Sequence, residues 1–344
     1  MNRGVLQTFR SLRCTPWTHI RRNISHQTNQ DTLMSNPFSI QNLQMIRESE
    51  SKFRIPNFIS FDGFDTLYSP RESVPLQYFK ISSEEFGISK SLQSIESEFG
   101  TVYKQLSHQF PNYGKGSEEI QDTGAWWSEL IIRLYDLDRS DPKTKLICDR
   151  LLEHFSGKEA YQVYDDVIPT LTKLKLFGIK LVLSSNSDER VRLILDNLGL
   201  SKFFESDDIF LSYELETSKP NRLFFDKVSE SIFQANYEFS LKSNNEVKIQ
   251  YLENCWHVGD NYDEDFLGAI RSGWNGILLD RHYTSDFFKH NPNKKKSYDG
   301  CFTEKSLDDR DTSSNDYMIV ANNRIVLTRL SQLLDIFELS LETK

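Results

Sequence analysis

Cysteine and histidine are scarce in this chain of 344 residues, and their spacing excludes the familiar metal-binding motifs. The four cysteines are widely separated, which predicts free thiols in a reducing compartment, and the seven histidines show no ligand spacing. No apolar run approaches the roughly 20 residues of a membrane-spanning helix, so we expect no membrane partner. The net charge of −9 argues against nucleic acid as a main partner. None of these features predicts an oligomeric state or a substrate.

Acidic residues are missing from the start of the chain before Asp31, a stretch that holds five arginines. Leu6, Phe9 and Trp17 are spaced to form an apolar face between these arginines. An acid-free, arginine-rich, amphipathic start is the signature of a mitochondrial targeting segment. We therefore interpret residues 1–24 as a targeting segment for the mitochondrial matrix. Residues 25–52 then form a polar linker. The alternative is a disordered basic tail on a protein of the cytoplasm or nucleus.

A short apolar run from Phe58 to Phe61 predicts a buried strand, and Asp62 follows it directly. Gly63 then lets the chain turn or a ligand approach closely. Ligands in open α/β sheets collect beyond the carboxyl ends of strands, so an aspartate here is well placed for chemistry. Aspartate is also a common turn residue, so this run does not decide the function by itself.

The rest of the chain predicts two kinds of structure. Between residues 71 and 164 apolar residues recur at helical spacing, which predicts an all-helical insert, the cap domain. From residue 165 onward short apolar runs alternate with helical patterns, which predicts right-handed crossovers and a parallel sheet. We therefore expect an α/β core built from residues 53–70 and 165–344. Residues 290–316 read as a disordered or surface insertion within it.

Three further elements are expected in the core. A helix should begin at Lys219-Pro220, because proline is favourable in the first helical turn. A last strand is expected over residues 317–321 and a last helix over residues 328–339, where leucines recur at helical spacing.

Polar residues follow a predicted strand or open a predicted helix in four separate units of the sheet: Asp62, Ser185, Lys219 and Asp260. Such positions converge on one crevice in a parallel sheet. There Asp62 would attack phosphorus and form an aspartyl-phosphate, while Ser185 and Lys219 would bind the phosphoryl oxygens. Asp62 and Asp260, with Asp265 nearby, would share Mg²⁺, a hard ion that binds one or two carboxylates plus substrate oxygens.

The order and identity of these residues resemble the haloacid dehalogenase-like (HAD) superfamily over residues 56–281. Asp62 matches the family nucleophile, Ser185 its second motif, Lys219 its third, and Asp260 with Asp265 its fourth. The resemblance implies a Rossmann-like core with a small helical cap. It also implies a Mg²⁺-dependent hydrolase that acts on a small phosphorylated substrate, with the backbone carbonyl of Phe64 as a further metal ligand.

Three features look like the "rhythmically expressed gene two"-like subgroup of that superfamily: the loop from Phe110 to Gly114, the Trp126-Trp127 pair and the run from Phe61 to Leu67. Loops on a helical lid often bind the substrate, so Tyr113 is a candidate substrate-binding residue, as is Asn186 beside Ser185. A turn without a further role is the alternative for the loop. The tryptophan pair predicts core packing.

One residue departs from the family pattern. Family phosphatases carry a second aspartate two positions after the nucleophile, as general acid and base, whereas this chain has Phe64 there. General acid–base catalysis is typically worth ~10²–10⁴-fold in rate. Asp65 is a possible substitute. Family dehalogenases also carry an aromatic residue here but need no metal.

Three interpretations therefore stay open. The first is a Mg²⁺-dependent phosphohydrolase with weak activity, because its second aspartate is replaced. The second is a non-catalytic HAD fold that binds a phosphorylated metabolite or a protein partner. The third is a carbon–halogen hydrolase.

We predict that the mature protein begins near Ser25 and lies in mitochondria. The run Arg22-Asn23-Ile24-Ser25 looks like a junction at which targeting segments are trimmed. N-terminal sequencing of the protein from purified mitochondria measures where the mature chain starts. An intact Met1 in a cytosolic fraction would contradict the prediction.

Overall fold

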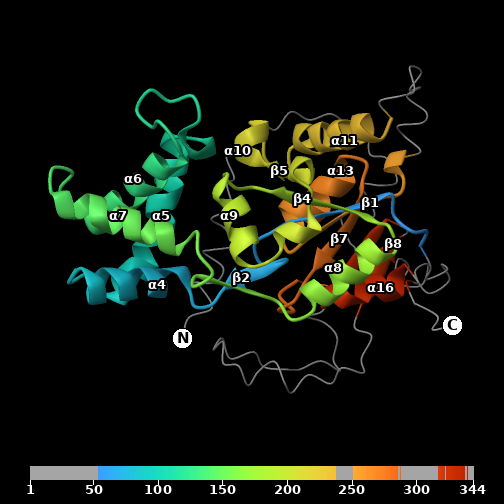
Figure 1. Ribbon diagram of the computed structural model, residues 1–344, viewed down its shortest axis with the longest axis horizontal. Helices are drawn as coiled ribbons and strands as arrows, with labels where there is room; N and C mark the ends of the chain where they lie inside the picture. Colours follow the sequence, from blue (N-terminus) through green and yellow to red (C-terminus); the bar gives the residue numbers. More distant parts are fainter. Residues whose placement is uncertain are drawn as a thin grey trace, which may run out of the picture.

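The computed structural model describes residues 53–237, 251–285, 287, 317–321, 323–337 and 339. The predicted targeting segment, polar linker and surface insertion (1–24, 25–52 and 290–316) lie outside the described residues. The described chain forms an α/β core and a separate group of helices, which stand at the right and left of Figure 1. A narrow pair of strands joins these two parts.

A seven-stranded sheet runs through the core in the order β5-β4-β1-β6-β7-β9-β8. The strands are β1 (Phe58–Phe61), β4 (Lys180–Ser185), β5 (Ile209–Leu211), β6 (Cys255–Gly259), β7 (Asn275–Leu279), β8 (Met318–Ala321) and β9 (Arg324–Leu327). Neighbouring strands are parallel, except for the antiparallel pair β8 and β9 at one edge. This arrangement confirms the predicted α/β fold with a mostly parallel sheet.

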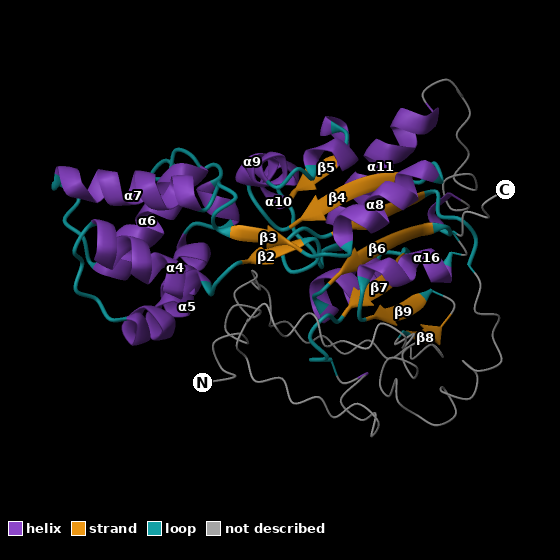
Figure 2. Ribbon diagram, turned by 60° about the horizontal axis from the view of Figure 1, so that its bottom comes forward, coloured by secondary structure: helices purple, strands orange, loops and turns teal. Residues whose placement is uncertain are grey.

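Helices cover both faces of this sheet, as Figure 2 shows. They are α8 (Val167–Leu176), α9 (Arg190–Asn197), α10 (Ser212–Leu215), α11 (Arg222–Tyr237), α13 (Gly268–Arg271) and α16 (Leu333–Ile336). Ile59 and Leu181 share one apolar cluster with α8, α9 and α16, whereas Phe58 and Val182 share another with α11 and α13. Successive residues of a strand point to opposite faces, so both sides of β1 must be apolar.

The helical insert contains α4 (Val74–Lys80), α5 (Leu92–Gln109), α6 (Thr123–Tyr135) and α7 (Pro142–His154). We call these four helices and their loops the cap. The Asp122 and Asp141 side chains accept hydrogen bonds from first-turn N–H groups of α6 and α7, which fixes where these helices begin. The helical spacing in the sequence therefore reflects real helices.

A two-stranded ribbon connects the cap to the core. Strand β2 (Tyr68–Pro70) enters the cap and pairs antiparallel with β3 (Tyr161–Val163), which returns from it. The sequence does not predict this ribbon, because three residues are too few to show the alternation of a strand. Both connections to the cap therefore run side by side.

The helix expected at Lys219-Pro220 begins two residues later than predicted. Helix α11 begins at Arg222, and the peptide bond between Lys219 and Pro220 is cis. The Asn221 side chain accepts a hydrogen bond from the N–H of Leu223 over 3.0 Å. Asparagine is a preferred residue for such a cap, so it rather than the proline determines where the helix begins.

The C-terminal segment also differs from its prediction. The last helix expected over residues 328–339 is a 3₁₀ turn, Leu330–Gln332, followed by α16. The expected last strand is present as β8, but β9 has no counterpart in the prediction. Its four residues are too few for their spacing to distinguish a strand from a helical turn.

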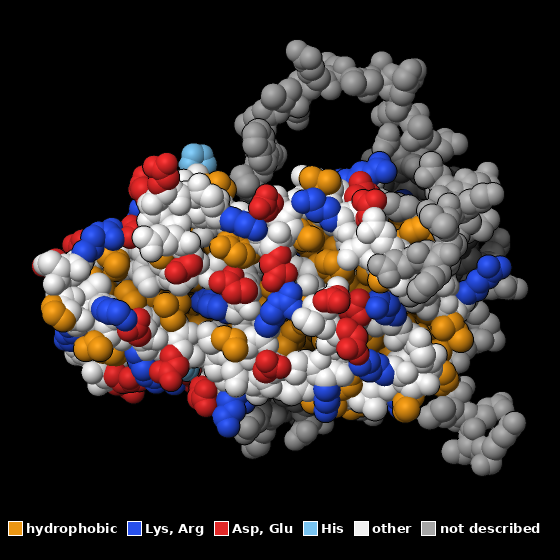
Figure 3. Space-filling model, turned by 45° about the horizontal axis from the view of Figure 1, so that its top comes forward, with side chains coloured by type: hydrophobic (Ala, Val, Ile, Leu, Met, Phe, Trp, Pro, Cys, Tyr) orange, Lys and Arg blue, Asp and Glu red, His pale blue; other side chains and the backbone are white. Residues whose placement is uncertain are grey.

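The surface carries charges of both signs. On the face drawn in Figure 3, acidic and basic side chains are interspersed over the cap and the core. Within the described ranges, no helix has both the length and the apolar character that crossing a membrane requires.

Arg281 lies just beyond β7 and links three distant segments. Its Nη2 donates to the carbonyl oxygen of Thr66 over 2.9 Å, and its Nη1 donates to Asp166 Oδ2 over 3.1 Å. Asp166 also accepts a hydrogen bond from the N–H of Leu330 over 2.6 Å. The guanidinium carbon lies 4.0 Å from the ring centroid of Tyr164. The turn after Asp62, the return from the cap and the C-terminal segment are thus held together by the Arg281–Asp166 ion pair.

We predict that Arg281→Met lowers the free energy of unfolding by about 3–5 kcal/mol, because it leaves the Asp166 carboxylate buried without its cation. Adding Asp166→Asn should recover part of this loss. Lys145→Met breaks an exposed pair with Asp149 and should change stability by no more than about 0.5 kcal/mol. Urea unfolding measures all three. Equal effects of the Arg281 and Lys145 substitutions would contradict the prediction.

Candidate active site

Asp62 follows β1 directly and lies at the carboxyl end of the sheet. Its N–H donates to the carbonyl oxygen of Val258 over 2.9 Å, so the pairing with β6 continues through this residue. The chain then turns, since the N–H of Leu67 donates to the Gly63 carbonyl oxygen over 2.8 Å. Asp62 is 2% exposed. A carboxylate is therefore fixed at the end of a buried strand.

The ammonium group of Lys219 lies among three oxygen acceptors. Its Nζ is 2.8 Å from Asp62 Oδ1, 2.6 Å from Asp265 Oδ1 and 2.7 Å from the carbonyl oxygen of Ser184. Burial of this side chain disfavours the charged form, but the carboxylates of Asp265 and Asp62 outweigh it and raise the pKa of Lys219. Lys219 is therefore a buried cation that two carboxylates share.

Ser185, the last residue of β4, adds a hydroxyl group to the same carboxylate. Its Oγ donates to Asp62 Oδ1 over 3.2 Å and lies 3.3 Å from Ser187 Oγ. Because β4 pairs in parallel with β1, their carboxyl ends lie side by side. The structure thus brings Ser185 and Lys219, from separate parts of the chain, into contact with the same Asp62 oxygen.

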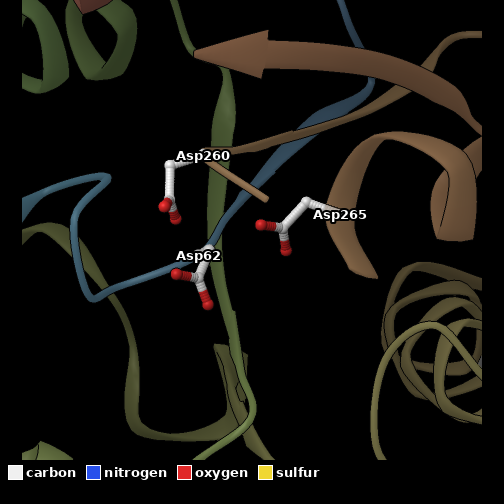
Figure 4. A group of neighbouring side chains, drawn as sticks. All are labelled: Asp62, Asp260 and Asp265. Carbon is white, nitrogen blue, oxygen red and sulfur yellow. The ribbon is translucent and has the colours of Figure 1, made fainter. Parts of the chain in front are cut away.

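Three carboxylates face one another at this end of the sheet, as Figure 4 shows for Asp62, Asp260 and Asp265. One oxygen of each lies within 4.8 Å of the others. Asp260 directly follows β6, and Asp265 lies in the helical turn Tyr262–Leu267. Oxygen atoms at this spacing can hold a hard divalent cation.

Asp265 is hydrogen-bonded on both carboxylate oxygens. Oδ1 accepts from Lys219 and lies 3.0 Å from His257 Nε2, while Oδ2 accepts from the N–H of Asn261 over 3.0 Å. Gly259 allows this close approach, because a Cβ atom there would lie 2.1 Å from Asp265 Cγ. The position of Asp265 therefore depends on a glycine at the end of β6.

A buried polar network that the sequence analysis did not single out continues from Asp265 into the sheet. His257 Nδ1 lies 3.0 Å from Ser60 Oγ, which is hydrogen-bonded to Ser184 Oγ over 2.8 Å. Burial lowers the pKa of His257, although its hydrogen bond to Asp265 acts in the opposite direction. The only signal in the sequence is a serine and a histidine inside otherwise apolar strands.

The two predicted substrate-binding residues, Asn186 and Tyr113, form hydrogen bonds within the protein. Asn186 Oδ1 accepts from the N–H of Lys219 over 2.8 Å, and its Nδ2 donates to the Lys219 carbonyl oxygen over 2.9 Å. Nδ2 also donates to Glu264 over 3.1 Å. Tyr113 Oη donates to the Asn186 carbonyl oxygen over 3.3 Å. Both residues hold the loop after β4, and their contact with a substrate stays a prediction.

Phe64 takes part in an aromatic cluster at the base of the ribbon. Its half-buried ring packs edge-on against Tyr68 and Tyr161, with centroids 6.2 and 6.5 Å apart. Asp65 has a left-handed backbone, with φ of 58°. Burial, together with the nearby charge of Asp65, raises the pKa of Tyr164. The N–H of Asp65 donates to the carbonyl oxygen of Tyr68 over 2.7 Å, and no proton donor is present at residue 64.

The fold and the four motifs are those of the haloacid dehalogenase-like class of proteins. The model of the haloacid dehalogenase-like hydrolase family matches residues 59–273, more than half of the chain. The chain therefore belongs to this family, as its resemblance predicted.

Two relatives show which members of the family this chain resembles. The chain is 30% identical to the Saccharomyces cerevisiae protein YMR130W over 291 residues, which are 82% of this chain and 93% of that protein. It is 26% identical to the Rhythmically expressed gene 2 protein of Drosophila melanogaster, covering 67% and 84% of the two chains. The predicted subgroup resemblance is thereby confirmed.

The fold also occurs among solved structures. The Bacillus subtilis protein YfnB, in a structure bound to magnesium, superposes with a TM-score of 0.51 at 15% identity, covering 83% of this chain and 99% of that one.

We predict that Gly259→Ala lowers the free energy of unfolding by about 1–3 kcal/mol, because the added methyl group forces Asp265 from its place. Gly124→Ala in the cap is the matched control, since its nearest contact would be Asp122 Oδ1 at 3.2 Å. Chemical unfolding of both variants measures the difference. A Gly259 variant as stable as the Gly124 variant would show that Asp265 is not constrained in this way.

Proposed function

We propose that this protein is a Mg²⁺-dependent phosphohydrolase of the mitochondrial matrix that acts on a small phosphorylated metabolite. The observation that carries the proposal is the Lys219 ammonium group, which lies within hydrogen-bonding distance of both Asp62 and Asp265. A buried cation beside a carboxylate nucleophile favours an anionic substrate, because it offsets the repulsion between that substrate and Asp62.

The acidic cluster fits a magnesium ion, which prefers oxygen ligands and often uses one or two carboxylates plus substrate oxygens. Asp62 and Asp260 would hold the ion, with the backbone carbonyl of Phe64 as the family resemblance implies. Asp265 would support them from nearby, because both its oxygens already accept hydrogen bonds from the protein. When bound, the ion would neutralise charge on the phosphoryl group and orient it.

In the proposed reaction, a carboxylate oxygen of Asp62 attacks the phosphorus atom. The bond from phosphorus to the leaving oxygen breaks, and an aspartyl-phosphate forms. Ser185 and Lys219 would bind the phosphoryl oxygens during this step. Water then attacks the phosphorus atom, which releases inorganic phosphate and restores Asp62. The leaving oxygen takes its proton from solvent, because Phe64 supplies none.

The aromatic packing of Phe64 favours one alternative, a HAD fold that binds a phosphorylated metabolite or a protein partner without turnover. A carbon–halogen hydrolase is supported less well. Family dehalogenases need no metal, whereas this site combines three carboxylates at metal-binding distance. Release of chloride or fluoride from haloacids tests that third interpretation directly.

We expect the wild-type protein to hydrolyse members of a phosphate-ester panel with Mg²⁺ and to lose this activity with EDTA. Asp62→Asn should abolish hydrolysis, because an amide is not a nucleophile for phosphorus. Release of inorganic phosphate is the measurement. Activity of Asp62→Asn near that of the wild type would indicate a contaminant or another mechanism. A folded wild type that is inactive on every ester would favour the binding role.

We further predict that Phe64→Asp increases hydrolysis of alkyl phosphates by up to ~10²–10⁴-fold, the usual contribution of a positioned acid. Nitrophenyl and acyl phosphates should gain least, because their leaving groups need no proton. Replacing the packed ring with a carboxylate should also lower the melting temperature, which must be measured in parallel. A folded, Mg²⁺-binding variant with no gain on any ester would contradict the proposal that hydrolysis is limited by the missing proton donor at residue 64.

A further inference from the structure

Two adjacent tryptophans on α6 donate hydrogen bonds to different parts of the protein. Trp126 Nε1 donates to the carbonyl oxygen of Phe110 over 3.0 Å, entirely within the cap. Trp127 Nε1 donates to Asp188 Oδ2 over 2.8 Å, and Asp188 belongs to the loop that follows β4 in the core. Trp127 therefore links the cap to the core, whereas Trp126 does not.

Asp188 is a buried anion that Arg190 and Trp127 hold in place. It is 3% exposed and forms a bidentate pair with Arg190, with distances of 2.9 Å to Nε and 2.8 Å to Nη2. Burial opposes its ionisation, but Arg190 and the Trp127 N–H outweigh this and lower the pKa of Asp188. The Arg190 guanidinium also lies 4.5 Å from the ring centroid of Trp127. Trp127 thus contacts both members of the ion pair.

The loop after β4 also contacts two residues that are proposed to bind phosphate, Ser185 and Lys219. Ser185 contacts Asp62, and the Asn186 side chain binds the backbone N–H and carbonyl oxygen of Lys219. Tyr113 of the cap donates to the Asn186 carbonyl oxygen, and its ring stacks on Trp127 with centroids 6.1 Å apart. Hydrogen bonds from the cap and hydrogen bonds to Lys219 therefore meet within three consecutive residues, Asn186 to Asp188.

We propose that Trp127 is a positioning residue of the active site. Its hydrogen bond to Asp188 fixes the loop from Ser185 to Asp188, so that docking of the cap and ordering of Ser185 and Lys219 occur together. The consequence for catalysis rests on the proposed phosphohydrolase function. Phosphoryl transfer would then be favoured only while the cap covers the site and excludes bulk water.

Amide hydrogen exchange of the full chain, with Mg²⁺ present, tests the positioning role without any substrate. Trp127→Phe keeps an aromatic ring but removes the N–H donor, so exchange of residues 186–190 and of Lys219 should accelerate by about two- to tenfold. Trp126→Phe is the matched control, and it should accelerate exchange only near Phe110 in the cap. Equal exchange of residues 186–190 in both variants would overturn the proposal.

Steady-state hydrolysis of p-nitrophenyl phosphate with Mg²⁺ tests the catalytic consequence. Trp127→Phe should lower kcat by about two- to tenfold with little change in KM, and Trp126→Phe should retain the wild-type kcat. Asp188→Ala combined with Trp127→Phe should lose no more than Asp188→Ala alone, because removal of the carboxylate already removes the acceptor of the Trp127 hydrogen bond. Additive losses would overturn the proposal. A wild type without activity would contradict the proposed function, while the exchange comparison still decides the role of Trp127.

Discussion

The interaction on which the site depends is the ion pair between Lys219 and the carboxylates of Asp62 and Asp265. Each buried charge costs several kcal/mol to remove from water, and each is compensated here mainly by the others. The three residues come from the end of β1, the segment before α11 and the turn after β6. A single misplaced strand would leave at least one charge without its partner. Correct folding of the sheet and assembly of the site are therefore the same event.

Around this ion pair, the protein holds each participant by a second contact. Asn186 binds the backbone of Lys219, the N–H of Asn261 binds Asp265, and Ser185 binds Asp62. Such supporting hydrogen bonds fix the orientation of a charged group. A lysine or a carboxylate side chain has no fixed orientation by itself. The geometry of the candidate site is thus set by hydrogen bonds within the protein itself.

The sequence predicted the positions of the site residues better than their contacts. Asp62, Ser185, Lys219 and Asp260 could be predicted, because parallel strands place residues at their carboxyl ends on one edge of the sheet. The direction of a side chain depends on its neighbours in space, so the sequence could not show that the Asn186 amide binds the backbone of Lys219, and its contact with a substrate stays a prediction. The sequence does not distinguish Trp127 from its neighbour Trp126. Only the packing of α6 shows that Trp127 bonds to the core, whereas Trp126 bonds within the cap. The short strands β2, β3 and β9 carry too few residues for a pattern.

The ribbon of β2 and β3 has a consequence for how such a protein can evolve. Because these strands pair with each other, the cap leaves and re-enters the core at adjacent points. The order and register of the seven-stranded sheet involve no residue of α4 to α7. A lineage could therefore lengthen or shorten this insert without altering the order of the strands, provided that Trp127 and Tyr113 keep their hydrogen bonds to the loop after β4.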